Sequence, residues 1–264
     1  MSSKVIRRVF SSKSKLGNLA VVEVCKSKVV FKNTQQLQQK AFKNSLAISA
    51  FIFLENFTPF PCYRIRWFSP VSEVIMCGHG ALAAADVVIS LLHANGKHKQ
   101  CLFSNKGITV SLSMLGQYIL HLPIVELVHI PLSQNILYLF KVDVLSAMQT
   151  DKDNGYIVIE LADVTGVEAF DFDEKSFSEI TQRALIVTCR CEDYSETIFF
   201  RYFAPQHGEK EDNATGSAAP VLAEFWQLLI GVRYCFIQLS ASGGYYQVER
   251  EIDEVRVISD VYGE

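Results

Sequence analysis

Two short glycine-bearing segments combine residue types that can move a proton. In the first, residues 77–80 (CGHG), Cys77 and His79 flank a glycine. A thiol at a helix start is biased toward its thiolate, and an imidazole titrates near neutral pH. The second, residues 211–217 (EDNATGS), contains the carboxylate of Asp212. Acid–base chemistry needs a proton acceptor and a proton donor, so the two segments together predict a proton-transfer site.

The glycines predict how a substrate is held. A helix start presents unpaired backbone N–H groups, and glycine lets that backbone approach a ligand closely. Such a helix start binds a carboxylate, so we expect a small carboxylic acid as the substrate. The expected substrate-binding residues are Gly78, Gly80, Thr215, Gly216 and Ser217, and the expected catalytic residues are Cys77, His79 and Asp212.

Each of these residues also has a structural interpretation. Ser217 and Asp212 can cap a helix, Cys77 can be a small buried apolar residue, and His79 can be a structural histidine. The residue types also match a Ser–His–Asp hydrolase triad, although Ser217 lacks the Gly-x-Ser-x-Gly pattern of a nucleophile elbow. The turn at residues 243–245 (GGY) is either a hairpin connection or part of a pocket wall.

An internal repeat organises the chain around these segments. Residues 66–70 (RWFSP) resemble residues 201–205 (RYFAP), which lie 135 residues further along. Each copy then runs through a glutamate, Glu73 or Glu211, to its glycine-bearing segment. These two glutamates can be solvated loop charges. The repeat predicts two similar halves that bring two glycine-opened helices to one interface.

The elements around the repeat predict an α+β fold. The residues before each five-residue motif are rich in aromatic and β-branched side chains, as strands are. Apolar, alanine-rich segments follow at residues 82–92 and 221–230 and predict helices. Many short strands with few helices are typical of α+β proteins. We expect an N-terminal lobe at residues 1–116 and a C-terminal lobe at residues 117–264, with the active-site cleft between them.

Composition narrows the function further. The chain has 264 residues, 49% of them hydrophobic and 20% charged, and a formal net charge of −3. It has no basic stripe, so a nucleic-acid partner is not expected. No apolar run has the length of a membrane span, so a membrane partner is not expected. No signal-peptide core follows Met1, so we expect a cytoplasmic location. Seven scattered cysteines predict reduced thiols. No metal site and no cofactor fingerprint is expected.

The same motifs resemble a known family. Residues 66–84 and 203–218 are similar to two signatures of the phenazine-biosynthesis PhzF-like proteins, and residues 10–22 are similar to a weaker third one. The resemblance covers essentially the whole chain. It implies the diaminopimelate-epimerase fold, in which each lobe wraps a curved, mostly antiparallel sheet around a central helix. It also implies cofactor-independent proton transfer by an isomerase or epimerase, and a possible homodimer.

The resemblance assigns site residues and also shows a departure. By motif position, the family's active-site histidine, aspartate and serine fall on His79, Asp212 and Ser217. The family's principal acid–base glutamate falls on Ile48 or, with a shift of one residue, on Ala47. Neither side chain carries a proton. Two alternatives follow: Cys77 takes over the glutamate's role, or the protein is a catalytically impaired member that binds a small anion or acts through protein contacts.

Overall fold

The computed structural model describes residues 4–45, 48–56, 62–92, 99–129, 134–151, 154–207 and 209–264. The chain divides into two compact units, Met1–Leu122 with Arg256–Glu264, and Pro123–Val255. The division therefore falls after residue 122 instead of the predicted residue 116, because the strand Tyr118–Pro123 pairs with its predecessor in unit 1. The last residues return to unit 1, because Val261–Gly263 pairs with the first strand.

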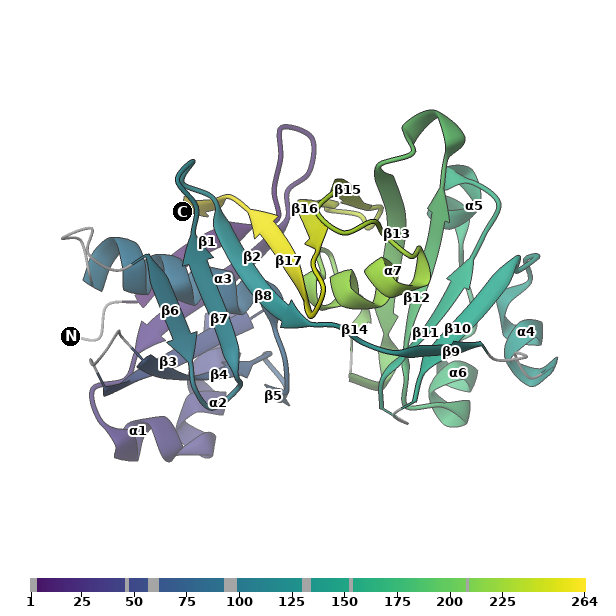
Figure 1. Ribbon diagram of the computed structural model, residues 1–264. Coiled ribbons are helices and arrows are strands. Elements are labelled where there is room, and N and C mark those ends of the chain that lie inside the picture. The colour runs from purple at the N-terminus through teal and green to yellow at the C-terminus, as the bar shows by residue number, and fades with distance from the viewer. Residues whose placement is uncertain are drawn as a thin grey trace. The chain divides into compact units, whose positions relative to one another are not determined.

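Unit 1 contains most of the N-terminal elements. Its elements are β1 (Lys4–Val9), β2 (Asn18–Val24), α1 (Lys28–Lys32), α2 (Thr34–Asn44), β3 (Ile48–Asn56), β4 (Cys62–Phe68), β5 (Glu73–Val74), α3 (Gly78–Asp86), the π-helix η1 (Val87–Leu92), β6 (Gln100–Phe103), β7 (Ile108–Leu112), β8 (Tyr118–Pro123) and β18 (Val261–Gly263). Figure 1 labels these elements except η1 and β18, and β17 (Glu254–Ser259) crosses from unit 2 into unit 1.

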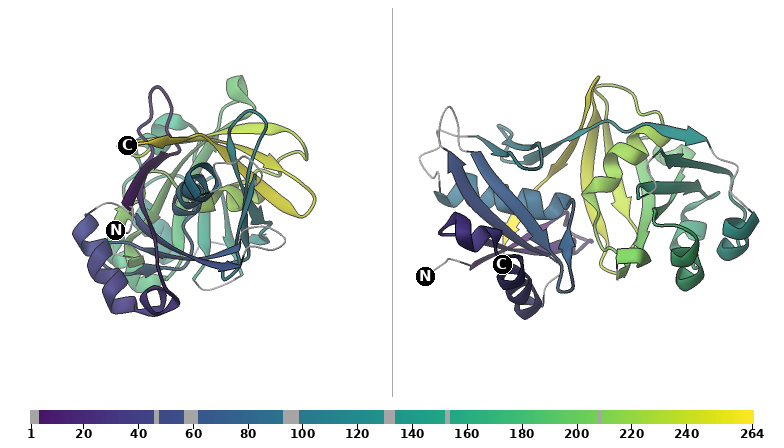
Figure 2. Two further views of the ribbon diagram at one scale, coloured as in Figure 1. Left: turned by 90° about the vertical axis from the view of Figure 1, so that its left-hand side faces the viewer. Right: turned by 90° about the horizontal axis from the view of Figure 1, so that it is seen from below.

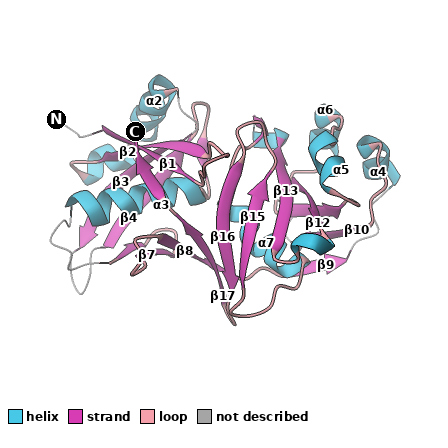
Figure 3. Ribbon diagram, turned by 90° about the horizontal axis from the view of Figure 1, so that it is seen from above, coloured by secondary structure: helices cyan, strands magenta, loops and turns pink. Residues whose placement is uncertain are grey.

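Unit 2 contains the elements of the second repeat. They are β9 (Leu127–His129), α4 (Gln134–Phe140), β10 (Ser146–Thr150), β11 (Tyr156–Glu160), α5 (Val164–Ala169), α6 (Glu174–Ile180), β12 (Ala184–Arg190), η2 (Glu192–Tyr194), β13 (Thr197–Ala204), η3 (Pro205–His207), β14 (Glu209–Glu211), η4 (Gly216–Ala218), α7 (Ala219–Phe225), β15 (Arg233–Gln238) and β16 (Gly244–Arg250). Three of its helices, α4, α5 and α6, gather on one side of β12 and β13 (Figure 3).

The strand pairing confirms that the units are copies of one topology. In unit 1, β1–β2 is antiparallel, β2–β3 parallel, β3–β4 antiparallel, β4–β6 parallel and β6–β7 antiparallel. In unit 2, the series β10–β11, β11–β12, β12–β13, β13–β15 and β15–β16 has the same alternation. The short strands β5 and β14 each pair with the strand that carries the repeated motif. The sheets are therefore mixed but mostly antiparallel, as predicted.

The strands of unit 1 curve around α3, which the left view of Figure 2 shows nearly end-on. All nine residues of α3, GHGALAAAD, are buried. Their small side chains let the surrounding strands approach the helix closely, because interior packing leaves few voids. The helix continues beyond Asp86 as the π-helix η1 and reaches the predicted end at Leu92. The start of α3 is therefore enclosed by the curved sheet of unit 1.

The equivalent helix of unit 2 is shorter than predicted. The alanine-rich segment predicted a helix up to Ile230, but α7 ends at Phe225. The reason lies in the backbone at Gln227, whose φ of 47° is left-handed and stops the helix. No helix among the described residues is both long and apolar enough to cross a membrane.

Candidate functional site

The start of α3 brings a thiol and an imidazole together. Cys77 is the N-cap of the helix, and its Sγ accepts a hydrogen bond from the backbone N–H of Gly80 at 3.4 Å. The same Sγ lies 3.6 Å from Nδ1 and 3.7 Å from Nε2 of His79. Both residues are buried, with 7% and 5% of their surface exposed. Cys77 is thus a helix cap as well as the neighbour of a group that can exchange its proton.

A tryptophan of β4 packs against the same helix start. A Cβ at Gly80 would lie 2.7 Å from Cδ1 of Trp67, so this position needs glycine. The indole Nε1 of Trp67 is buried and has no hydrogen-bond partner within the described part of the chain. A buried donor of this kind is satisfied by water or by a ligand in most proteins. The geometry accounts for Gly80 by packing, and its contact with substrate stays a prediction, as it does for Gly78.

In unit 2 the residues from Asp212 to Ser217 form a compact polar loop. The Thr215 hydroxyl donates to Oδ2 of Asp212 at 2.6 Å. Thr215 is the N-cap of η4, which begins at Gly216 and leads directly into α7. A side-chain hydrogen bond joins Ser217 to Tyr156 of β11. Asp212 and Ser217 therefore do not occupy the N-cap position of this helix, and the capping interpretation of these two residues is wrong.

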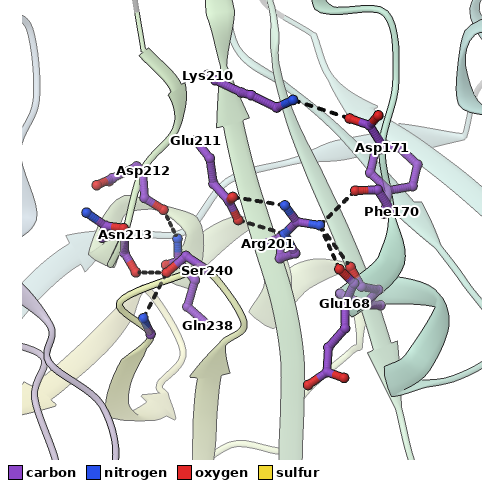
Figure 4. A network of polar contacts seen from close by, with 12 residues as sticks. Glu168, Phe170, Asp171, Arg201, Lys210, Glu211, Asp212, Asn213, Gln238 and Ser240 are labelled. Atoms are coloured by element: carbon purple, nitrogen blue, oxygen red, sulfur yellow. Dashed lines mark hydrogen bonds and ion pairs between the residues drawn. The ribbon is translucent and has the colours of Figure 1, made fainter.

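Three residues of the β15–β16 hairpin hold this loop (Figure 4). The buried Gln238 accepts from the backbone N–H of Thr215 at 2.7 Å and donates to the carbonyl of Asp212. Ser240 donates to the carbonyl of Asn213 at 2.6 Å, and Tyr246, which Figure 4 does not label, donates to the carbonyl of Thr215 at 2.8 Å. The loop conformation is thus fixed by side chains that lie more than twenty residues further along the chain.

The turn at residues 243–245 also touches the loop. A Cβ at Gly244 would lie 2.8 Å from Cβ of Ala214, so glycine allows the hairpin to lie directly against the loop. The turn joins β15 to β16 and is therefore a hairpin connection, as one of the two interpretations predicted. Close packing explains Gly244, and a left-handed φ of 68° explains Gly243.

Three tyrosines of unit 2 interact with the Asp212–Ser217 loop or with one another; Tyr246 is buried, and Tyr156 and Tyr202 are half-buried. Burial raises the pKa of Tyr246 well above its usual range, and the negative charge of Asp212 adds to the effect. The pKa of Tyr202 is raised by burial and by the charges of Tyr156 and Asp212. The pKa of Tyr156 is raised by burial, while its hydrogen bond to Ser217 opposes the shift. These phenols stay neutral at physiological pH and can act as hydrogen-bond donors.

Each unit carries the same ion pair, which we call the Arg–Glu clamp: Arg66 with Glu73, and Arg201 with Glu211. Arg66 donates through Nε and Nη2 to the two carboxylate oxygens at 2.8 and 2.5 Å, and Arg201 does the same at 2.7 and 2.9 Å. Arg201 also donates to the carbonyl of Phe170 at 2.7 Å (Figure 4). The two glutamates are therefore not solvated loop charges, because each closes a bidentate pair.

The position assigned to the family's glutamate carries no acid. Ile48 is the first residue of β3 and is buried, with its Cα paired to that of Ala20 in β2. Ala47, the alternative position, lies outside the described residues. Within the described chain, no three His, Cys, Asp or Glu side chains are grouped to hold a metal ion.

Each unit thus contains its own group of candidate site residues, and we call each group a half-site. Unit 1 places Cys77, His79 and the two glycines at the start of α3, and unit 2 places Asp212, Thr215 and Ser217 at the start of η4. Each half-site offers backbone N–H groups to an anion and side chains that can hold a proton. Sequence reasoning missed Tyr156, Gln238, Ser240 and Tyr246, which support the second half-site. No motif marks them, because they act from neighbouring strands.

Comparison with known proteins gives a consistent result. The model of the family described as phenazine biosynthesis-like protein (PhzC-PhzF) matches residues 8–258. An uncharacterised isomerase of Pseudomonas aeruginosa is 30% identical over 257 residues, which cover 94% of this chain and 90% of that protein. An uncharacterised isomerase of Vibrio cholerae is 35% identical over 197 residues, which cover 71% of this chain and 64% of that protein.

A solved structure shares the fold over the whole chain. The crystal structure of a PhzF-family phenazine biosynthesis protein from Enterococcus faecalis superimposes with a TM-score of 0.83 and 23% sequence identity. The match covers 100% of this chain and 97% of that one. This likeness confirms the predicted fold class.

Proposed function

Because the chain belongs to the phenazine biosynthesis-like (PhzF) family, we propose that it is a cofactor-independent isomerase or epimerase acting on a small carboxylic acid. Two relatives that match this chain are named isomerases. The observation that carries the proposal is the Cys77–His79 pair at the start of α3, where a helix start can bind a carboxylate beside two groups that exchange protons. A homodimer and a cytoplasmic location remain predictions.

The proposed reaction moves one proton. A base removes the hydrogen from the carbon beside the substrate's carboxylate, and the electron pair of the broken C–H bond delocalises into the adjacent π-system. An acid then returns a proton, either to the other face of the same carbon or to a conjugated carbon. Backbone N–H groups at a helix start stabilise the charge that develops on the carboxylate oxygens. No external oxidant, reductant or cofactor is needed for this balance.

The roles follow from the two half-sites. We assign proton transfer to His79 and Asp212, and binding of the substrate to Ser217, Thr215 and the glycines Gly78, Gly80 and Gly216. Cys77 replaces the missing acid of the family, because its Sγ lies within 3.7 Å of both ring nitrogens of His79. An imidazolium beside a thiolate stabilises it, and the thiolate is a competent base.

The test is proton exchange in D2O. A panel of small amino, hydroxy and unsaturated carboxylic acids is incubated with the protein, and loss of each α-proton signal is followed by NMR. We expect one class of acid to exchange, and we expect His79→Gln, Asp212→Asn and Cys77→Ser each to slow this exchange roughly 10²–10⁴-fold. Cys191→Ser, which changes a half-buried thiol outside both half-sites, is the matched control. Unchanged exchange in the His79→Gln/Asp212→Asn double variant would overturn the assignment.

A second candidate function is binding without turnover. The buried, apolar Ile48 at the family's glutamate position favours it. Ligand-observed NMR on the same panel separates the two candidates. Acids that bind saturably to the wild type without any exchange of their protons would indicate a catalytically impaired protein that retains an anion site.

A further inference from the structure

Unit 1 contains a cavity whose wall is rich in cations. Its volume is about 340 Å³, and it is open to solvent, since the lining residues Lys32 and Thr34 are exposed. The lining residues are Phe31, Lys32, Thr34, Arg64, Arg66, Glu73, Asn105 and Lys106. Four of them are cationic and only Glu73 is acidic, although the whole chain has a net charge of −3. The cavity is thus an electropositive site on an acidic protein.

Part of this charge serves the fold. Arg66 belongs to the Arg–Glu clamp, and it also donates to the carbonyl of Phe31 at 3.0 Å and to the hydroxyl of Thr34 at 2.8 Å. It therefore ties α1 and α2 to β4 and neutralises Glu73. The three remaining cations, Lys32, Arg64 and Lys106, are not part of this clamp.

The three remaining cations have few acidic neighbours. Arg64 approaches Glu55 at 3.4 Å, but Glu55 also accepts from Ser104 at 2.6 Å and lies outside the lining. Lys106 donates to the carbonyl of Ile75 at 2.9 Å, and its Nζ lies 5.3 Å from the centre of the Trp67 ring. The acidic neighbour of Lys106 is Glu73, whose pKa is lowered mainly by its hydrogen bond to Arg66 and further by the charge of Lys106. An excess of two positive charges remains even when Glu55 and Glu73 are both counted.

The cavity residues of β4 lie on the face opposite to the start of α3. Alternate residues of a strand point to opposite faces of its sheet. In β4, Trp67 contacts Gly80 at the start of α3, so Arg64 and Arg66 project from the other face. That face is covered by α1 and α2, whose Phe31 packs with Phe68 in one apolar cluster. Lys106 is the exception, because its Nζ lies over the Trp67 ring, but neither Cys77 nor His79 lines the cavity.

Unit 2 shows that the fold does not need these cations. It keeps the clamp, but the residue at the repeat position of Arg64 is Phe199, and the segment after Phe170 carries Asp171 where unit 1 has Lys32 after Phe31. Lys210 pairs there with Asp171 at 3.3 Å and Glu174 at 2.6 Å. The same corner of the repeat is therefore acidic in one copy and basic in the other, and only the clamp is common to both.

We propose that this cavity binds a small polyanion, a ligand with at least two negative charges carried by phosphate or carboxylate groups. Lys32, Arg64 and Lys106 supply the charge, and Thr34 supplies a hydroxyl at the cavity wall. The amide of Asn105 is held by the backbone N–H and carbonyl of Ile65 and acts as a fixed part of the wall. Arg66 is already saturated by the clamp and acts as a fixed part of the wall. The site goes beyond the proposed proton transfer and does not depend on it.

The test is a calorimetric titration of the full chain with pyrophosphate and with tricarballylate at low ionic strength. We expect saturable binding that weakens about fivefold in Lys106→Met and in Arg64→Gln, and that is unchanged in Lys175→Met, which removes an exposed charge from unit 2. Binding should also weaken at 0.5 M NaCl, because salt screens exposed charges. Tighter binding of pyrophosphate assigns the site to phosphate ligands, and tighter binding of tricarballylate assigns it to polycarboxylates.

Three results would overturn the proposal. They are the absence of saturable binding, binding that both cavity variants leave intact, and an equal loss in Lys175→Met. Thermal melts followed by circular dichroism check that the variants fold. If Lys106→Met fails to fold, Arg64→Gln still decides, because the Arg64 side chain is 38% exposed. Proton exchange by the wild-type protein is measured separately, so failure of this site leaves the proposed function untouched.

Discussion

Gln238→Leu tests whether one buried amide holds the second half-site. Gln238 is 0% exposed, and its side chain bonds three groups of the Asp212 loop: the N–H of Thr215, the carbonyl of Asp212 and the Thr215 hydroxyl. Leucine has a similar volume, so the substitution keeps the packing and removes these bonds. The Thr215 hydroxyl retains its bond to Oδ2 of Asp212.

The magnitude follows from the two backbone groups that lose their partner. A buried polar group left unsatisfied costs about 1–3 kcal/mol. Two such groups predict that Gln238→Leu lowers the free energy of unfolding by about 2–6 kcal/mol. The measurement is urea denaturation at pH 7, with the loss read from the midpoint at an unchanged slope. Gln35→Leu, which changes an exposed glutamine of α2, should shift the free energy of unfolding by less than about 0.5 kcal/mol.

Gln238→Glu adds a readout that simple loss of packing would not change. A carboxylate keeps the acceptor for the Thr215 N–H, but it opposes the carbonyl of Asp212 unless it is protonated. The folded protein therefore raises the pKa of the introduced carboxyl group, and stability falls as the pH rises. We expect a larger destabilisation at pH 8 than at pH 5. A Gln238→Leu loss below 0.5 kcal/mol, or equal losses for Gln238→Glu at both pH values, would refute this account of the loop.

Two further predictions concern the repeated clamp and the tyrosines of unit 2. Arg201→Met should lower the free energy of unfolding by about 3 kcal/mol and Arg66→Met by less, because Glu211 is 17% exposed whereas Glu73 is 36% exposed; equal losses in urea denaturation would contradict this. The raised pKa values of Tyr202 and Tyr246 mean that the unfolded chain loses phenolic protons near pH 10 while the folded chain keeps them. Stability should therefore fall above about pH 10, and Tyr246→Phe should reduce the slope of unfolding free energy against pH in that range; an unchanged slope would contradict it.

The sequence predicted the parts of the fold that are local or repeated. The motifs at residues 66–70 and 201–205 lie on β4 and β13, and the glycine-bearing segments begin α3 and η4, as the repeat predicted. These elements can be predicted from local sequence. The periodicity of a strand or helix and the residues that start a helix all lie within a few positions of each other.

The pairing of segments that are far apart in the chain could not be predicted from the sequence. The return of β18 to β1 joins residues that are more than 250 positions apart, and no residue type marks either strand for the other. The hairpin residues Gln238, Ser240 and Tyr246 act on a loop through single hydrogen bonds, which leave no periodic signal. The interpretation of Glu73 and Glu211 as solvated loop charges was wrong, because it did not pair them with the arginines of the repeated motif.

The duplicated fold separates residues that hold the structure from residues that can do chemistry. The Arg–Glu clamp is present in both copies of the topology. We therefore attribute the clamp to the fold and not to the chemistry. The two helix starts correspond in the repeat but differ in backbone and side chains. Cys77 caps the α-helix α3 through its side chain, whereas Thr215 precedes the 3-10 helix η4 without a capping bond, and His79 and Ser217 stand two residues further along. The shared topology does not require this difference. Under the proposed function unlike side chains are expected, because proton transfer needs one group that takes the proton and one that returns it.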